Sequence, residues 1–91
     1  MLVMVVERFK DAQAVYQRFA ARGRMLPDGV TYRDSWVSLQ GDLCYQLMEC
    51  IDRACLDEWM RRWEDLVDFE VVPVITSGEA VKKLSRDQPP A

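Results

Sequence analysis

The chain has 91 residues, which is the size of one small domain. Charged residues make up 30% and hydrophobic residues 49%, as in ordinary folded globular proteins, and the formal net charge is −3 at pH 7. Because an acidic chain is not attracted to phosphate backbones, we expect no nucleic-acid partner.

The sequence contains no histidine. This excludes Ser-His-Asp and Cys-His catalysis as they are usually built, together with histidine-ligated haem and zinc sites, and we expect neither a metal nor a cofactor. The three cysteines are an odd number, which fits a reducing compartment better than a disulfide framework. No segment has the length of a membrane span or the pattern of a signal peptide, so we expect a cytoplasmic protein without a membrane partner.

The first predicted strand runs from Leu2 to Glu7 and is apolar on both faces. Such a strand is normally covered on both sides. Helices of the same chain can cover one face, and in so short a chain a second subunit is the simplest cover for the other. Asp11 then caps a predicted helix over about Ala12 to Arg22, which Gly23 ends.

Two strands are predicted next, from Val30 to Leu39 and from Asp42 to Cys50, joined by a two-residue hairpin loop at Gln40-Gly41. With that loop, one face of the hairpin carries three opposed pairs: Trp36 and Tyr45, Asp34 and Leu47, and Tyr32 and Glu49. The other face carries Arg33, Ser35 and Val37 beside Met48, Gln46 and Cys44.

The second half of the chain predicts a helix over about Arg53 to Leu66, with apolar residues at helical spacing. The fourth predicted strand, Phe69 to Ile75, is expected at a sheet edge because Pro73 cannot donate a ladder hydrogen bond. A capping box at Thr76 predicts a last helix through about Leu84. We therefore divide the chain into a domain over residues 1–76 and a short helix with a frayed tail over residues 77–91.

The order β-α-β-β-α-β predicts a ferredoxin-like α+β fold with a short C-terminal helix. Five segments also match a known family: Met1 to Phe9 (MLVMVVERF), Arg22 to Gly29 (RGRMLPDG), Ser35 to Val37 (SWV), Cys44 to Glu49 (CYQLME) and Trp63 to Val74 (WEDLVDFEVVPV). On these segments the chain resembles the small, uncharacterised bacterial family known as domain of unknown function 3303.

The resemblance implies a dimeric α/β barrel, in which the four-stranded sheets of two protomers pack face to face. It carries over no catalytic residues, because no activity comes with the family. The wider superfamily includes cofactor-independent monooxygenases, haem-degrading enzymes, small isomerases and members without known chemistry. These activities are analogies at the level of the fold.

The first candidate site is the hairpin face that gathers two carboxylates and three aromatic rings. Aspartate is depleted in strands, so a functional role would explain Asp34 in mid-strand. In the functional interpretation, Asp34 or Glu49 transfers a proton in a partly apolar pocket, its pKa raised by burial. Tyr32, Trp36 and Tyr45 then bind a flat or apolar ligand. In the alternative interpretation, this face is a dimer interface or half-exposed.

The opposite hairpin face is the second candidate. There Arg33 and Gln46 hold an anionic or carbonyl group of a ligand, or else Arg33 reaches solvent and Gln46 bonds locally. If this face lines the cavity, Arg33, Gln46 and Cys44 become the better candidates. Arg22 and Arg24, at the end of the first predicted helix, either suit its macrodipole or bind an anion.

The cysteines suggest a further option, a redox-responsive thiol protein. A thiol near a helix N-terminus, as at Cys55, can have a lowered pKa, and Cys44 and Cys50 point to one side of the third predicted strand. Buried free cysteines otherwise behave as small hydrophobes. The spacing of the three fits no common zinc pattern.

Two classes of function remain for the whole protein. In the first, a homodimer binds a small apolar or aromatic metabolite in a cavity of each protomer and performs a cofactor-independent oxygenation or isomerisation. In the second, it is a non-catalytic interaction or ligand-sensing module that uses the fold for assembly. The sequence leaves open whether the protein is an enzyme, which ligand it takes and which sheet face lines the cavity.

Overall fold

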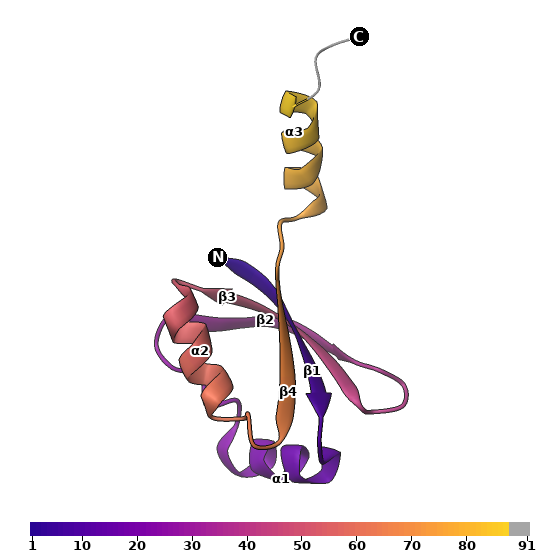
Figure 1. The fold of residues 1–91 in the computed structure, drawn as a ribbon, viewed down its shortest axis with the longest axis vertical. Coiled ribbons are helices and arrows are strands. Elements are labelled where there is room, and N and C mark those ends of the chain that lie inside the picture. Colours follow the sequence, from indigo (N-terminus) through magenta and orange to yellow (C-terminus); the bar gives the residue numbers. More distant parts are fainter. Residues whose placement is uncertain (88–91) are drawn as a thin grey trace.

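The computed structural model describes residues 1–87 and has the predicted element order (Figure 1). Its elements are β1 (Leu2–Phe9), α1 (Ala12–Arg22), β2 (Val30–Val37), β3 (Leu43–Cys50), α2 (Arg53–Arg61), β4 (Val67–Pro73) and α3 (Ser77–Asp87). The strands form one antiparallel sheet in the order β2-β3-β1-β4. This confirms the ferredoxin-like α+β fold and places β4, with its Pro73, at an edge.

The predicted caps explain the helix starts. The Asp11 side chain accepts a hydrogen bond from the Ala14 N–H at 3.1 Å, and Gly23 ends α1 at φ 66°, so the predicted bounds of α1 are confirmed. Asp52 caps α2 in the same way through the Cys55 N–H at 2.9 Å. The capping box of α3 is present between Thr76 and Glu79.

Several predicted bounds differ from the structure. Helix α2 ends at Arg61 rather than Leu66, because the chain tightens into turns in which the Trp63 N–H donates to the Met60 carbonyl at 3.0 Å. Strand β4 begins and ends two residues earlier than predicted. Helix α3 extends to Asp87. The predicted frayed tail, residues 88–91, lies outside the described residues.

The hairpin between β2 and β3 differs from the prediction in two ways. The two-residue loop is wrong: Ser38 and Leu43 form the last backbone bond at 2.9 Å, and the Ser38 hydroxyl also bonds Asp42, which supports a longer turn. The predicted pairs of Trp36 with Tyr45 and of Asp34 with Leu47 are confirmed.

A bulge at Arg33 shifts the register beyond these pairs. Tyr32 therefore lies opposite Met48 rather than Glu49, and a bulged strand places two residues against one on its partner. The prediction that Arg33 shares a face with Ser35 and Val37 is wrong, because the extra residue reverses the alternation of side chains at this point.

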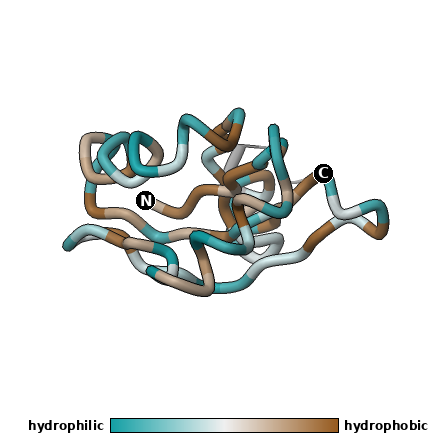
Figure 2. Tube along the Cα trace, turned by 90° about the horizontal axis from the view of Figure 1, so that it is seen from below, coloured by the Kyte–Doolittle hydropathy of each residue, from teal (hydrophilic) through white to brown (hydrophobic). Residues whose placement is uncertain are grey.

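One face of the sheet, the covered face, packs against α1, α2 and the turn that follows α2. Its core includes Val3, Val5 and Met48, all without exposed surface, with Leu56 and Trp59 of α2 packed among them. Hydrophobic stretches, brown in Figure 2, run through the layer of strands. The other face, the open face, has no element of the described chain over it and carries the even-numbered residues of β1, which are half-buried or exposed.

Helix α3 extends away from the sheet beyond the end of β4, clear of the other elements (Figure 1). Its apolar residues Val81 and Leu84 are exposed. No helix in the described part of the chain is both long and apolar enough to span a membrane.

Candidate functional site

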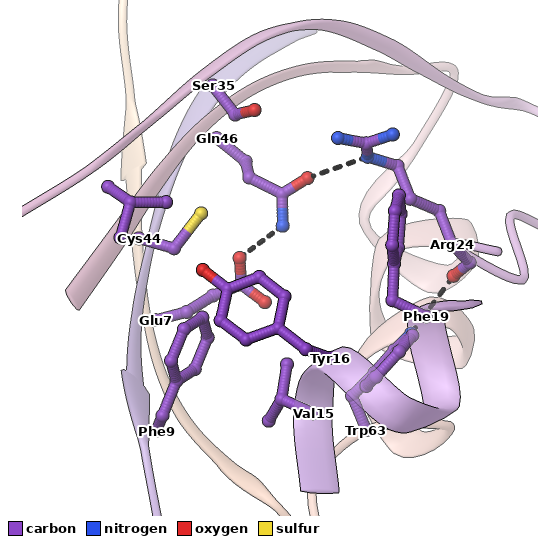
Figure 3. A pocket seen from close by; sticks show the side chains of 11 residues that line it. Glu7, Phe9, Val15, Tyr16, Phe19, Arg24, Ser35, Cys44, Gln46 and Trp63 are labelled. Atoms are coloured by element: carbon purple, nitrogen blue, oxygen red, sulfur yellow. Dashed lines mark hydrogen bonds between the residues drawn. The ribbon is translucent and has the colours of Figure 1, made fainter. Parts of the chain in front are cut away.

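A cavity of about 150 Å³ lies between α1 and the covered face of the sheet (Figure 3). Apolar side chains form much of its wall, among them Phe9, Val15, Phe19 and Trp63. Polar groups enter it from five separate parts of the chain: Glu7, Tyr16, Arg24, Ser35, Cys44 and Gln46. A mostly apolar cavity with a few converging polar groups is the usual form of a small-molecule site.

The strand register builds the floor of this cavity from two neighbouring rows of side chains. One row crosses the sheet as Val37, Cys44, Glu7 and Phe69, and the next as Ser35, Gln46, Val5 and Val71. Because residues opposite each other on antiparallel strands share a face, the polar members of both rows point toward α1. The polar groups therefore meet in the middle of an otherwise apolar face.

Glu7 and Gln46 are the buried polar residues of the described chain, with 4% and 8% of their surfaces exposed. The Gln46 Nε2 group donates a hydrogen bond to Glu7 Oε2 (Figure 3). Burial raises the pKa of Glu7 above the usual value for a carboxyl group, and this effect is opposed by the hydrogen bonds of Gln46 and Cys44 and by the charge of Arg24. A carboxyl group in this state is suited to give or take a proton.

The cysteines are not set up as reactive thiols. Burial and the neighbouring Glu7 raise the pKa of Cys44 to about 12, so its thiol stays protonated at neutral pH. Burial also raises the pKa of Cys50, and the hydrogen bond with Asp52 raises that of Cys55 despite its place at a helix N-terminus. The redox-thiol option therefore loses its physical support.

Arg24 reaches the cavity from the loop after α1, and an unusual backbone holds it there. Its carbonyl accepts two indole N–H hydrogen bonds, from Trp59 and from Trp63, both at 2.9 Å. The next residue, Met25, has φ +56°, which is uncommon for a residue with a side chain, and its carbonyl accepts from Arg62 at 2.7 Å. The loop is thus fixed by α2 and the turn behind it, since strained backbone persists only where its surroundings hold it.

The Arg24 side chain completes a hydrogen-bonded chain across the pocket. Its Nε donates to Gln46 Oε1 at 3.2 Å, and Gln46 in turn donates to Glu7 (Figure 3). The guanidinium lies 3.6 Å from the centre of the Tyr32 ring and 5.1 Å from that of Phe19. This arrangement orients the Gln46 amide and sets a cation one side chain away from the buried carboxyl group.

The residues predicted for the first candidate site lie elsewhere. Asp34, Trp36, Tyr45 and Glu49 belong to the open face, where Trp36 is 51% exposed. The Asp34 carboxylate accepts from the Ser35 N–H at 2.8 Å. Tyr32 is separated from them by the bulge and lies on the covered face, beneath Arg24.

The second candidate site is only partly brought together. Gln46 and Cys44 line the cavity, but Arg33 lies on the open face and forms an ion pair with Glu49. Among the side chains that the structure describes, no group of three of the types His, Cys, Asp and Glu is arranged to hold a metal ion.

Sequence reasoning did not single out Glu7, and it named Arg24 only as an alternative anion-binding residue at a helix end. For Glu7 a signal exists, because it is a charged residue in phase with Val3 and Val5 on a strand that is otherwise apolar there. For Arg24 the local sequence offers two interpretations, a charge that suits the end of a helix or an anion-binding residue. It cannot decide between them, because the Trp59 and Trp63 indoles that hold the Arg24 backbone lie 35 and 39 residues away.

Comparisons with known proteins agree with this fold. Curated protein sequences give no significant match. A solved structure, "Structure of Rv0793 from Mycobacterium tuberculosis", is 21% identical with a TM-score of 0.50, and the match covers 85% of this chain and 98% of that one. This likeness shows the fold alone. The family model described as Domain of unknown function (DUF3303) matches residues 1–88, nearly the whole chain, and the protein therefore belongs to that family.

Proposed function

We propose that the protein binds a small, largely apolar or aromatic metabolite between α1 and the sheet, and that Glu7 exchanges a proton with it. The observation that carries this proposal is the buried Glu7–Gln46 pair on the wall of an apolar cavity. A buried carboxyl group without a direct ion pair is unfavourable for stability. A cleft residue with a pKa displaced by burial is for that reason a candidate for function.

The size of the cavity bounds the ligand. A volume of about 150 Å³ is similar to that of a protein cavity that accepts benzene, and smaller than the ~300–1,000 Å³ of pockets for drug-sized molecules. Tyr16 and Phe19 are both partly exposed on α1 and offer flat surfaces at its edge. The ligand is therefore about one ring in size.

The chemistry that Glu7 supplies is general acid–base catalysis. An isomerisation needs only that the carboxylate takes a proton from one atom of the ligand and returns it to another. We favour this reaction over an oxygenation, because it is completed by proton transfer alone. Binding without turnover, as in a ligand-sensing module, uses the same pocket.

We also propose that a second copy of the chain covers the open face, giving the dimeric barrel. Two rows cross this face: Val72, Met4, Leu47 and Asp34, then Glu70, Val6, Tyr45 and Trp36. The middle of both rows is apolar or aromatic, and contiguous apolar surfaces of this kind mark interfaces. The acidic ends of the rows lie at the two edges of the sheet. The predicted pocket around Asp34 and Glu49 is, in this proposal, part of the interface.

Proton transfer can be measured with a simple ketone. We expect the protein to accelerate exchange of the α protons of cyclohexanone with D₂O, followed by ¹H NMR. The substitution Glu7→Gln removes the acid and should lower this rate by about 100-fold. Glu64→Gln, an equal change at an exposed glutamate, should leave it unchanged.

The same assay distinguishes the two faces. Loss of exchange in Asp34→Asn or Glu49→Gln, with the rate of Glu7→Gln intact, would move the site to the open face and overturn the proposal. Binding of cyclohexanone in the pocket, seen by amide chemical shifts but without accelerated exchange, would favour the sensing function.

A further inference from the structure

Arg24 carries a half-buried positive charge that pairs with no carboxylate among the side chains of residues 1–85. Its contact with Glu7 runs through the neutral Gln46 amide. A second half-buried arginine, Arg18, is fully paired, since its two Nη atoms donate to Asp65 at 2.8 and 2.7 Å. Both arginines lie on the covered side of the sheet, but of the two only Arg24 lines the cavity. The arginine without a carboxylate partner is therefore the one at the cavity wall.

The position of the Arg24 guanidinium is fixed by its neighbours, while its Nη1 and Nη2 atoms remain available to bind a ligand. The Tyr32 and Phe19 rings flank it, and the two indoles fix the backbone from which it extends. In the described structure only Nε has a hydrogen-bond acceptor, the Gln46 amide oxygen. Ser35 and Gln46 lie on the same side of the cavity as the guanidinium (Figure 3). A fixed guanidinium with both Nη atoms free is suited to bind a carboxylate through two parallel hydrogen bonds.

We propose that the ligand of this cavity is a small cyclic monocarboxylate, whose carboxylate binds Nη1 and Nη2 of Arg24 while its ring lies against the apolar wall toward Glu7. This inference rests on the proposed function, of which it names the ligand class. One cation faces the cavity, so a single negative charge is matched, whereas a dianion such as a phosphate ester would leave a buried excess of charge beside Glu7. The ring then lies between the anchoring cation and the carboxyl group that moves the proton.

Two probes of nearly equal shape, benzoate and benzamide, test the inference on the full chain. Affinities are measured from amide chemical shifts at neutral pH. We expect benzoate to bind about tenfold more tightly than benzamide, or about 1.4 kcal/mol, because hydrogen bonds between charged groups are stronger than those to a neutral amide. Arg24→Gln should lower benzoate affinity to the benzamide level and leave benzamide affinity unchanged. Arg22→Gln removes the same charge from an exposed position two residues away and should change neither affinity.

The outcomes separate this inference from the proposed function. Equal binding of both probes in the cavity, or an equal loss of both in Arg24→Gln, would overturn the carboxylate anchor and leave the pocket standing. If neither probe shifts the amides of the cavity, the proposed function fails and the anchor fails with it. Should Arg24→Gln not fold, Arg24→Lys keeps the charge without the planar fork, and benzoate affinity should still fall severalfold with benzamide unaffected.

Discussion

The two faces of the sheet share the same four strands and differ in what covers them. On β1, Val3, Val5 and Glu7 point to the covered face and are buried, whereas Met4 and Val6 point to the open face and are only half-buried. Both faces are largely apolar. On the covered face, however, the polar groups are enclosed and bonded to one another, and on the open face they are exposed.

This difference decides what a carboxylate does on each face. Glu7 is buried, and its burial raises its pKa. Glu49 lies one strand away on the open face, half-exposed and ion-paired with Arg33. The same type of side chain is therefore a candidate acid where it is buried, on the covered face, and part of a surface ion pair on the open face.

The two faces should respond most differently to the same valine-to-aspartate substitution, placed first on the covered face and then on the open face. Val5→Asp puts an unpaired charge into a fully buried site, and we expect a loss of about 4 kcal/mol or more in the free energy of unfolding. Urea unfolding followed by circular dichroism measures it. A Val5→Asp protein as stable as the native chain would show that the covered face is not the core.

The adjacent substitution, Val6→Asp, should leave each protomer folded and disrupt the dimer. A charge buried without a partner in an apolar interface weakens association by about 3 kcal/mol, or roughly 100-fold in the dissociation constant. Sedimentation velocity over a dilution series measures this, with Gln13→Asp on the exposed side of α1 as the control. A native chain that sediments as a protomer at every concentration would refute the proposed interface.

The pH dependence of stability should separate Glu7 from the exposed acids. Its pKa is higher in the folded protein than the 4.5 of a free side chain, so the folded state holds the proton more tightly. The resulting stabilisation is complete below pH 4.5 and is lost as the pH rises through the pKa of the folded state. The stability of Glu7→Gln relative to the native chain should therefore increase over that window.

The groups that face Glu7 do not complicate this measurement. The Cys44 thiol, with a pKa of about 12, stays protonated throughout, and Arg24 is the same in both proteins. Tyr16, on α1, also lines the cavity and is the same in both proteins. Urea unfolding at a series of pH values gives the curve. The quantity to follow is the free energy of unfolding of Glu7→Gln minus that of the native chain. If this difference stays constant or falls as the pH rises, the pKa of Glu7 is not raised.

The fold was predictable from short-range signals, and the site only in part. Caps at Asp11 and Asp52 and the edge proline Pro73 act within a few residues, and the structure confirms them. The bulge at Arg33 cannot be recognised from the polar and apolar pattern of the sequence. It nevertheless decides that Tyr32 and not Arg33 faces the helices. Arg24 depends on indoles far along the chain, and a local pattern cannot report such a contact.

The smallest expected effect concerns the indoles of the two faces. Trp63→Phe removes one of the two donors to the Arg24 carbonyl, which should lower the free energy of unfolding by about 1 kcal/mol. Trp36→Phe, on the open face, should change it by less than about 0.5 kcal/mol, because this side chain is half exposed. Both are best measured in the Val6→Asp background, which removes any contribution of the proposed dimer. If Trp63→Phe also weakens benzoate binding and Trp36→Phe does not, the Trp63 indole holds Arg24 in place for its ligand. If the two substitutions lower the free energy of unfolding equally, the hydrogen bond from Trp63 to the Arg24 carbonyl adds nothing to stability.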